Sequence, residues 1–182
     1  LLHGTPTRLS REAPVVVLRH EREFYLPGGA ANCAANLISL GARVSLFGVV
    51  GKDPAGAYLR GFFRRKGADL RGLLSDPRYQ TISKTRVLAG DPHRTKQQIV
   101  RIDREPPPMP AVLAARLAAL AAKTRGLDAW LLADYGYGVV TAPALAGAKA
   151  RVRVGTSRYA MGRLKNLTAV TANEAEALEA SG

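Results

Sequence analysis

Residues 27–51 read PGGAANCAANLISLGARVSLFGVVG, and this stretch decides the expected fold. Its glycine pair opens directly into residues 31–40, a small-residue segment that predicts a helix buried on a sheet and stopped by Gly41. Residues 43–50 then predict an apolar strand. A helix that starts with two glycines has almost no side chains in its first turn, so a ligand can approach its free N–H groups closely. We therefore expect a binding function at the start of this helix.

The composition is that of a globular protein with one main unit. The chain has 182 residues, of which 47% are hydrophobic and 23% are charged. No apolar run approaches the ~20 residues that span a bilayer, so we expect no membrane segment. Residues 1–14 lack the features of a secretory signal, and the single cysteine, Cys33, cannot form an internal disulfide. Both observations favour a cytoplasmic location.

The formal net charge of +13 raises the question of nucleic-acid binding, because a clustered basic face is the footprint of phosphate-backbone contacts. The densest basic run, 60–66, falls on an amphipathic helix whose other face is aromatic and aliphatic. A solvated helix face is therefore favoured, and we expect no nucleic-acid partner. An anionic small molecule, such as a sugar phosphate or a nucleotide, accounts for the arginines at least as well.

Local patterns place further elements along the chain. Residues 1–14 predict a loop, and two short strands follow it, separated by His20. Asp53 and Pro54 predict the N-cap and first position of a helix that ends near Gly67. The remaining expected elements are strands at 68–74, 81–88, 96–103, 128–133, 151–154 and 167–171, and helices at 111–123, 143–149 and from Asn173 onward.

The order of these elements predicts the fold class. Helices and strands alternate from residue 28 onward, which indicates an α/β fold with a mostly parallel sheet covered by helices. Strands 81–88 and 96–103 flank a turn-rich loop and predict a hairpin. Together with the strands at 15–26, this hairpin predicts a small polar sheet apart from the main one.

Few residues outside the first stretch suggest chemistry. The chain has no Gly-x-x-x-x-Gly-Lys-Ser/Thr loop, no Cys/His cluster with zinc spacing and no Gly-x-Ser-x-Gly elbow. Its histidines, His3, His20 and His93, all fall in segments expected to be loop or turn, and we assign them no catalytic role. Asp134 is a site candidate, because it ends an apolar strand and the carboxyl ends of such strands line the crevice of α/β sheets.

Six collinear segments resemble the ribokinase-like, or phosphofructokinase-B, family of carbohydrate kinases. The spacing of the glycines and Asn32 in residues 28–51 matches the first signature of the family. The other segments look like its heptose 7-phosphate kinase branch: RLSREAPVVVL, KTRVLAG, QQIVRIDRE, ADYGYG and TANEAEAL. The resemblance implies one ribokinase-like domain over 1–182, a three-layer α/β/α core at 27–80 and 111–182, and a β-sheet lid with strands at 14–26 and 81–103.

The resemblance also implies ATP-dependent phosphoryl transfer to a hydroxyl of a sugar or sugar phosphate, and a homodimer formed through the lid. Residues that match substrate-binding positions, with Asp134 added from the strand pattern, are Gly28, Gly29, Asn32, Lys84, Arg86, Gln98, Arg101, Asp103 and Asp134. Glycines permit close approach, an amide can pair with a sugar diol, and cations suit a phosphate. A helix-start turn and a solvated hairpin face remain the plainer alternatives.

Asn173 and Glu176 match the N-x-x-E motif of the family, which implies a role in binding ATP and in ordering Mg²⁺, for Glu176 through water. Two oxygen ligands one helical turn apart suit a hard cation. Without the resemblance, Asn173 is a helix N-cap.

The sequence departs from the family at several points. The Gly-Asp strand expected before residue 1 and the Gly-Ala-Gly-Asp segment expected after N-x-x-E, with its catalytic aspartate, are not in the sequence, so we expect a chain incomplete at both ends with no catalytic residue of its own. Tyr137 stands where the motif D-Y-x-K-G has lysine, Thr156 where D-S-R-Y has aspartate, and Ala172 in place of a common proline. Three hypotheses compete: a heptose-phosphate-type kinase, an inactive sugar-phosphate-binding relative, and a basic nucleic-acid-binding domain, of which the first is favoured.

Overall fold

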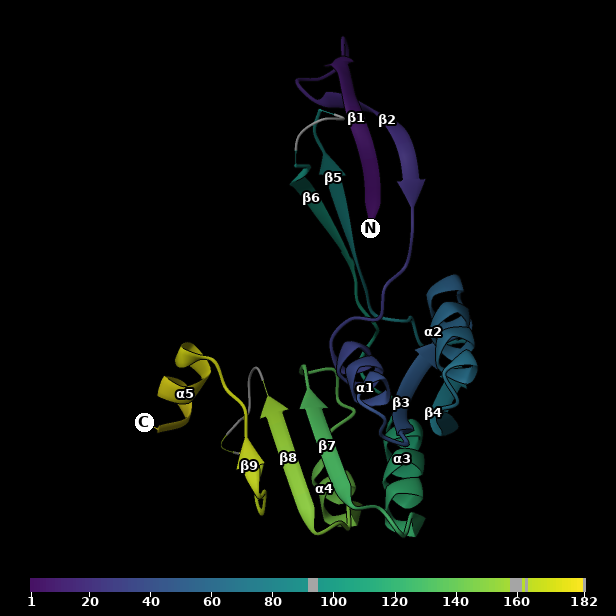
Figure 1. Ribbon diagram of the computed structural model, residues 1–182, viewed down its shortest axis with the longest axis vertical. Helices are drawn as coiled ribbons and strands as arrows, with labels where there is room; N and C mark the ends of the chain where they lie inside the picture. The colour runs from purple at the N-terminus through teal and green to yellow at the C-terminus, as the bar shows by residue number, and fades with distance from the viewer. Residues whose placement is uncertain (92–94, 158–161, 163, 182) are drawn as a thin grey trace.

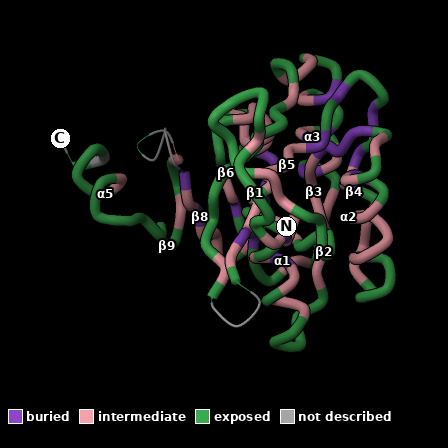
Figure 2. Tube along the Cα trace, turned by 90° about the horizontal axis from the view of Figure 1, so that it is seen from above, coloured by how far each residue is buried: buried purple, intermediate pink, exposed green. Residues whose placement is uncertain are grey.

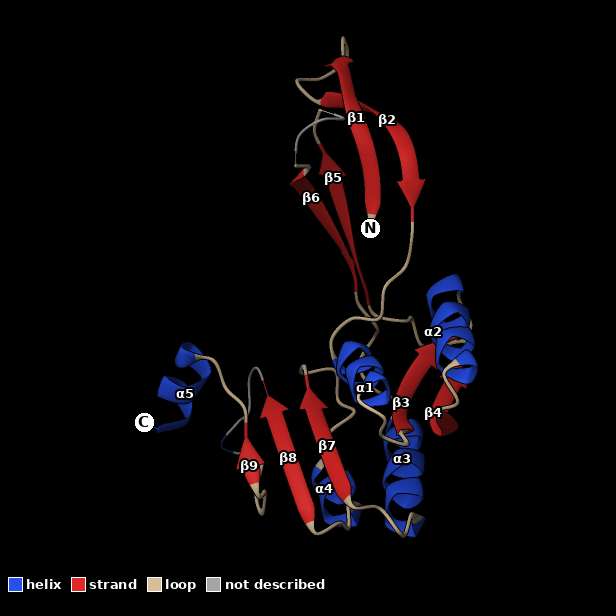
Figure 3. Ribbon diagram, in the orientation of Figure 1, coloured by secondary structure: helices blue, strands red, loops and turns tan. Residues whose placement is uncertain are grey.

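The fold is described from a computed structural model that covers every residue except 92–94, 158–161, 163 and 182. In chain order the elements are β1 (Leu2–Leu9), β2 (Val16–Glu23), α1 (Ala30–Ser39), β3 (Ser45–Gly51), α2 (Pro54–Arg65), β4 (Asp69–Asp76), β5 (Ser83–Ala89), β6 (Gln97–Arg104), α3 (Ala111–Lys123), β7 (Ala129–Asp134), α4 (Ala142–Gly147), β8 (Val152–Ser157), β9 (Ala169–Val170) and α5 (Glu174–Ser181). The prediction of an α/β fold is confirmed (Figure 3).

The described strands form three sheets. A four-stranded sheet, called here the upper sheet, has the order β2-β1-β5-β6 and stands above the rest of the molecule in Figure 1. In the lower part, β3 pairs with β4, and β7, β8 and β9 form a second sheet; all of these pairs are parallel. The predicted parallel pairing is confirmed, but the described strands of the lower part form two sheets where one was expected.

The β5–β6 hairpin is antiparallel, as its sequence predicted. The rest of the upper sheet corrects two expectations. The segment predicted as a loop contains β1, which pairs with β2 along its length and with β5 over Leu2–Gly4. The two short strands predicted around His20 are the single strand β2. Strand β1 was not predicted because it contains Pro6. This proline lies beyond the stretch of β1 that pairs with β5, so its missing N–H is tolerated there.

Helices α1 and α2 begin and end close to where their sequences predict. The Asp53 carboxylate accepts a hydrogen bond from the Gly56 N–H at 2.8 Å, so Asp53 is the N-cap of α2 as expected. Helix α1 is less buried than predicted, since only Ala34 of its residues is buried, and Leu40, its C-cap, is 84% exposed. Part of its apolar face borders an open groove, which accounts for the difference.

The core lies where α3 packs on the lower strands. One cluster joins Val49 and Leu74 to Leu117 of α3, and a second joins Trp130 of β7 to Ala148. Figure 2 shows the buried segments gathered around α3, β3 and β4, while β6 and most of α5 are exposed. Among the described residues, no helix has both the length and the apolar character to cross a membrane.

Asp76, at the end of β4, makes stability depend on pH in acid. Hydrogen bonds from the Arg78 side chain, at 2.9 and 3.1 Å, and from its backbone N–H, at 2.8 Å, lower the pKa of Asp76 to about 2. An unfolded aspartate titrates near pH 3.9, so the charged carboxylate stabilises the fold above about pH 4 and this stabilisation is lost as the pH falls toward 2. Urea unfolding at pH 5 and at pH 2.5 should therefore show a smaller loss of stability in Asp76→Asn than in the parent chain. Equal losses in both would mean that other groups control acid unfolding.

Candidate functional site

A cleft extends from the base of the upper sheet, past the carboxyl ends of β3 and β7, and down the gap between these two strands. Its volume is about 2020 Å³, and its lining includes the start of α1, the base of β5 and β6, and the loop after β7. This volume exceeds the 300–1,000 Å³ of a typical small-molecule pocket. The cleft is therefore larger than a single small molecule requires.

The structure brings most of the predicted site residues together in this cleft. Those that line it are Gly28, Gly29, Lys84, Arg86, Arg101, Asp103 and Asp134. The other four predicted site residues lie outside the cleft lining: Asn32, Gln98, Asn173 and Glu176.

The start of α1 presents backbone with little side-chain cover. Gly29 is its N-cap, with φ 51° and ψ −128°, and neither a side-chain cap nor an acidic residue lies in the first turn. Tyr135 closes over it: a Cβ placed on Gly29 would lie 3.2 Å from the Tyr135 ring. Because the N-terminus of a helix carries partial positive charge, this end suits a negatively charged or hydrogen-bond-accepting ligand group.

Asp103 holds two cations at the base of the upper sheet. The Lys84 ammonium lies 2.8 Å from one carboxylate oxygen, and the Arg101 guanidinium donates to both oxygens at 2.8 and 3.0 Å. The hydrogen bond from Lys84 lowers the pKa of Asp103, and the same contact raises the pKa of Lys84. Arg86 also lines the cleft, and within the described residues its side chain makes no ion pair. Arg86 is thus a cation available to an anionic ligand.

Both carboxylate oxygens of Asp134 accept hydrogen bonds from within the protein. One carboxylate oxygen accepts a hydrogen bond from the Gly136 N–H at 3.0 Å, and the other accepts one from the Ser157 hydroxyl of β8 at 2.9 Å. Ser157 is fully buried. These bonds fix the start of the loop that follows β7, so Asp134 positions this loop whether or not it also meets a ligand.

Tyr135, Tyr137 and Glu105 are cleft residues that the sequence did not single out as site candidates. The Tyr137 hydroxyl donates to the Glu105 carboxylate at 3.0 Å, which links the loop after β7 to the end of β6. Burial, together with this hydrogen bond, raises the pKa of Tyr137. The signal that could have found the two tyrosines is the alternation of aromatic residues and glycines in ADYGYG, directly after a strand that ends at the cleft.

Asn173 and Glu176 form a capping box at the start of α5. The Glu176 N–H donates to the Asn173 side-chain oxygen at 2.9 Å, and the Asn173 N–H donates to the Glu176 carboxylate at 3.0 Å. Their oxygens therefore satisfy backbone donors. Helix α5 lies beyond β9, away from the cleft (Figure 1).

The sequence predicts that Glu176 orders Mg²⁺ through water, a role that needs no cluster of ligands in the described part of the chain. There, no group of three or more His, Cys, Asp or Glu side chains is placed to hold a metal ion. The expected ligand Glu176 is engaged in the capping box. The expectations for His93 and for Arg158 and Tyr159 of the D-S-R-Y-like segment fall outside the described residues.

The sequence matches known carbohydrate kinases. The pattern of the pfkB family carbohydrate kinases matches residues 4–104. A protein of Azorhizobium caulinodans named bifunctional protein HldE is 41% identical over 189 residues, which cover 98% of this chain and 38% of the relative. The HldE protein of Geobacter sulfurreducens is 50% identical over 104 residues, 57% of this chain and 20% of the relative. The chain thus spans about 38% of the length of the curated relatives that match it end to end.

Solved structures share the fold at low sequence identity. The crystal structure titled Sa239 superposes with a TM-score of 0.69 at 15% identity, covering 100% of this chain and 60% of that one. A mutant of phosphofructokinase-2 from Escherichia coli gives a TM-score of 0.65 at 12% identity, covering 98% and 59%. These similarities support the ribokinase-like fold predicted from the sequence.

Proposed function

Because the chain belongs to the pfkB family of carbohydrate kinases, we propose that it binds the acceptor in an ATP-dependent phosphoryl transfer to a sugar hydroxyl. The proposed acceptor is a sugar phosphate of the heptose 7-phosphate type, since the chain's motifs resemble the heptose 7-phosphate kinase branch of the family. The observation that carries the proposal is one cleft that joins the start of α1 to the charged base of the upper sheet.

Each lining group has a role that suits a phosphorylated sugar. The backbone at Gly28 and Gly29 can be approached closely by a hydroxyl. Asp103 accepts hydrogen bonds from hydroxyls, while Lys84 and Arg101 hold its carboxylate in place and donate in turn. Arg86 binds the phosphate already present on the sugar, because a guanidinium pairs well with phosphate oxygens. Closure of the upper sheet over the cleft, as a lid, would exclude water.

The proposal includes ATP and Mg²⁺ as cosubstrate and cofactor, by family membership. The described residues do not supply a set of metal ligands, so no step is assigned to the metal. Four residues outside the cleft lining remain proposed ligand contacts: Asn32, Gln98, Asn173 and Glu176. The chain would have to change conformation, or the ligand extend beyond the cleft, for them to meet it. A cytoplasmic location follows from the proposed use of ATP.

Homodimerisation through the upper sheet is also proposed. Ile99, Val100 and Ile102 of the edge strand β6 are each about half exposed, between 48% and 51%. Exposed apolar groups on an edge strand favour pairing with another chain.

The test is to measure binding and turnover separately. Isothermal titration with heptose 7-phosphate, unphosphorylated heptose and inorganic phosphate should show tightest binding to the sugar phosphate. Incubation with ATP and Mg²⁺ then reports turnover. Turnover would overturn the inactive-relative hypothesis. Binding to DNA that weakens with salt, without sugar-phosphate binding, would overturn the proposal.

Arg86→Ala should weaken sugar-phosphate binding roughly 10-fold or more, because a charge-assisted hydrogen bond contributes about 1.5–3 kcal/mol. Arg19→Ala is the matched control: it removes the same charge from β2 of the same sheet, at an exposed position outside the cleft lining. Titration calorimetry on both variants measures the difference. An equal effect in the two would show that Arg86 acts only through net charge.

A further inference from the structure

We propose that the Glu105 carboxylate, held in place by Tyr137, makes the acceptor site selective for a sugar that carries one phosphate, by repelling a second phosphate at the end away from Arg86. The acceptor site is here the part of the cleft between the start of α1 and the base of the upper sheet. The inference rests on the proposed function, because it concerns the same acceptor.

The charges along β5 and β6 change sign toward the core. Arg86 of β5 lies directly opposite Arg101 of β6. The next row toward the core pairs Lys84 with Asp103 (Figure 1). Glu105 directly follows β6, two residues beyond Asp103. All five side chains belong to residues that line the cleft, so a ligand meets cations at one end of this surface and a carboxylate at the other.

The row formed by Arg86 and Arg101 suits a single phosphate. Like charges in directly opposite positions destabilise a sheet, and an anion bound between them would relieve the repulsion. The guanidinium of Arg101 already donates to both oxygens of Asp103, whereas Arg86 makes no ion pair among the described residues. One phosphate at this row therefore uses the cation that the protein leaves available.

At the core end, one ammonium group is shared by two carboxylates. The Lys84 nitrogen lies 2.8 Å from an Asp103 oxygen and 4.0 Å from a Glu105 oxygen. Arg104 lies on the opposite face of the sheet, where its guanidinium donates to the Thr85 hydroxyl at 3.5 Å. A second phosphate at the core end would therefore lie beside a carboxylate that has only a partial counter-charge.

Tyr137 holds Glu105 without neutralising it. Its hydroxyl donates to the Glu105 carboxylate at 3.0 Å. Burial, together with this hydrogen bond, raises the pKa of Tyr137, so the phenol stays protonated and uncharged. Lysine, which the motif D-Y-x-K-G has at this position, would instead place an ammonium group beside the carboxylate and cancel its charge. The tyrosine thus preserves a negative charge at the core end of the site.

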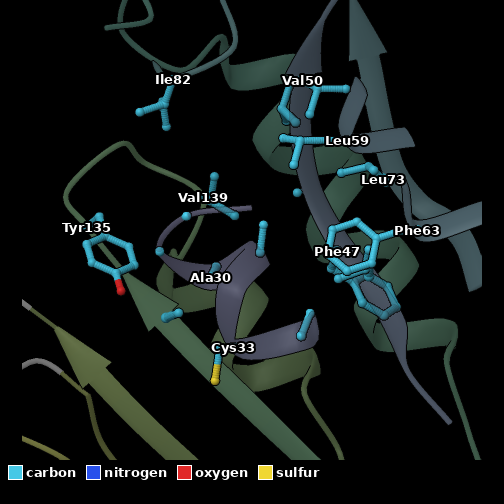
Figure 4. A pocket seen from close by; sticks show the side chains of 18 of the residues that line it. Ala30, Cys33, Phe47, Val50, Leu59, Phe63, Leu73, Ile82, Tyr135 and Val139 are labelled. Carbon is cyan, nitrogen blue, oxygen red and sulfur yellow. The ribbon is translucent and has the colours of Figure 1, made fainter. Parts of the chain in front are cut away.

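The loop after β7 connects this charge to the sugar-binding end of the cleft. Tyr135 lies against the start of α1, since a Cβ on Gly29 would be 3.2 Å from its ring, and Figure 4 shows Tyr135 near Ala30 in the first turn. The backbone of Tyr137 is within about 7 Å of that of Tyr135. The start of a helix carries about half a positive charge, against the full negative charge of Glu105. Sugar hydroxyls, which hydrogen bond to both groups, are therefore favoured here over a second phosphate.

The experiment compares heptose 7-phosphate with the same sugar carrying a second phosphate, by titration calorimetry. The ratio of their dissociation constants should show weaker binding of the bisphosphate to the parent chain. Glu105→Gln removes the charge and keeps an acceptor for the Tyr137 hydroxyl, and it should reduce this ratio roughly 10-fold, because the second phosphate carries nearly two charges. Tyr137→Lys should reduce the ratio similarly by adding a cation. The matched control is Glu12→Gln, the same change at an exposed position between β1 and β2, outside the cleft lining, and it should leave the ratio unchanged.

Salt provides a second readout that a purely structural role would not affect. The side chain of Glu105 is 58% exposed, so high salt should lower the ratio in the parent chain more than in Glu105→Gln. Equal ratios in the parent, Glu105→Gln and Tyr137→Lys would overturn the inference while leaving the proposed function intact. An equal reduction in Glu12→Gln would also overturn it, since net charge would then be the cause. If the parent binds neither sugar phosphate, the proposed function itself fails, and the selectivity fails with it.

Discussion

Gly56→Ala is expected to lower the free energy of unfolding by about 3 kcal/mol. A Cβ at this position in the first turn of α2 would lie 2.3 Å from the Gly51 carbonyl oxygen and 2.9 Å from the Thr81 hydroxyl. The Thr81 hydroxyl accepts a hydrogen bond from the Gly51 N–H, and Asp53 accepts from the N–H groups of Gly56 and Thr81, each at 2.8 Å. A side chain at 56 must push these backbones apart, and overpacking of this kind costs about 1–3 kcal/mol, occasionally more.

Gly61→Ala in the same helix is the matched control. A Cβ there meets only the Arg65 guanidinium, at 3.4 Å, which can move aside. Alanine stabilises a helix interior by about 0.5–1 kcal/mol relative to glycine, so this variant should be as stable as the parent or more so. Urea unfolding of both variants measures the contrast. If the two glycines respond alike, the contact network at the end of β3 does not constrain residue 56.

The elements that the sequence predicted well are those with local signals. Asp53 followed by Pro54 marked the start of α2 because an N-cap and a first-turn proline act within one helical turn. The β5–β6 hairpin was predictable because its strands flank their own turn. Strand β1 also forms a hairpin with the next strand, β2, so its main pairing is local as well. It was missed because its own pattern contains Gly4 and Pro6, which favour a loop or turn.

The candidate site was predictable in its residue types but not in their pairing. The motif resemblance drew attention to Lys84, Arg101 and Asp103, yet only the register of β5 and β6 reveals that one carboxylate holds both cations. The N-x-x-E motif has two explanations that look the same in sequence, a metal site and a capping box. The hydrogen bonds between Asn173 and Glu176 have the geometry of the second.

Gly29→Ala is expected to destabilise the chain by about 2–3 kcal/mol and to weaken sugar-phosphate binding roughly 10-fold. The backbone of Gly29, at φ 51° and ψ −128°, lies in a region that residues with a Cβ rarely adopt, and such strain costs about 1–3 kcal/mol. The added Cβ would also press on the Tyr135 ring at 3.2 Å. To relieve the backbone strain or the contact with the Tyr135 ring, the first turn of α1 must shift. This turn is the backbone proposed to bind the sugar.

Gly28→Ala is the matched control for the loss of a glycine at the start of α1. A Cβ at residue 28 would have no atom within 4 Å, and the φ of Gly28 is not positive. This variant should leave stability within about 0.5 kcal/mol of the parent. The double variant Gly29→Ala/Tyr135→Ala, compared with Tyr135→Ala alone, then divides the Gly29 effect between backbone strain and ring contact. If the cost of Gly29→Ala persists without the ring, the conformation of residue 29 is its source. If the cost disappears, the ring contact is the source, and Tyr135 rather than the backbone angle sets how α1 presents its N-terminus to the cleft.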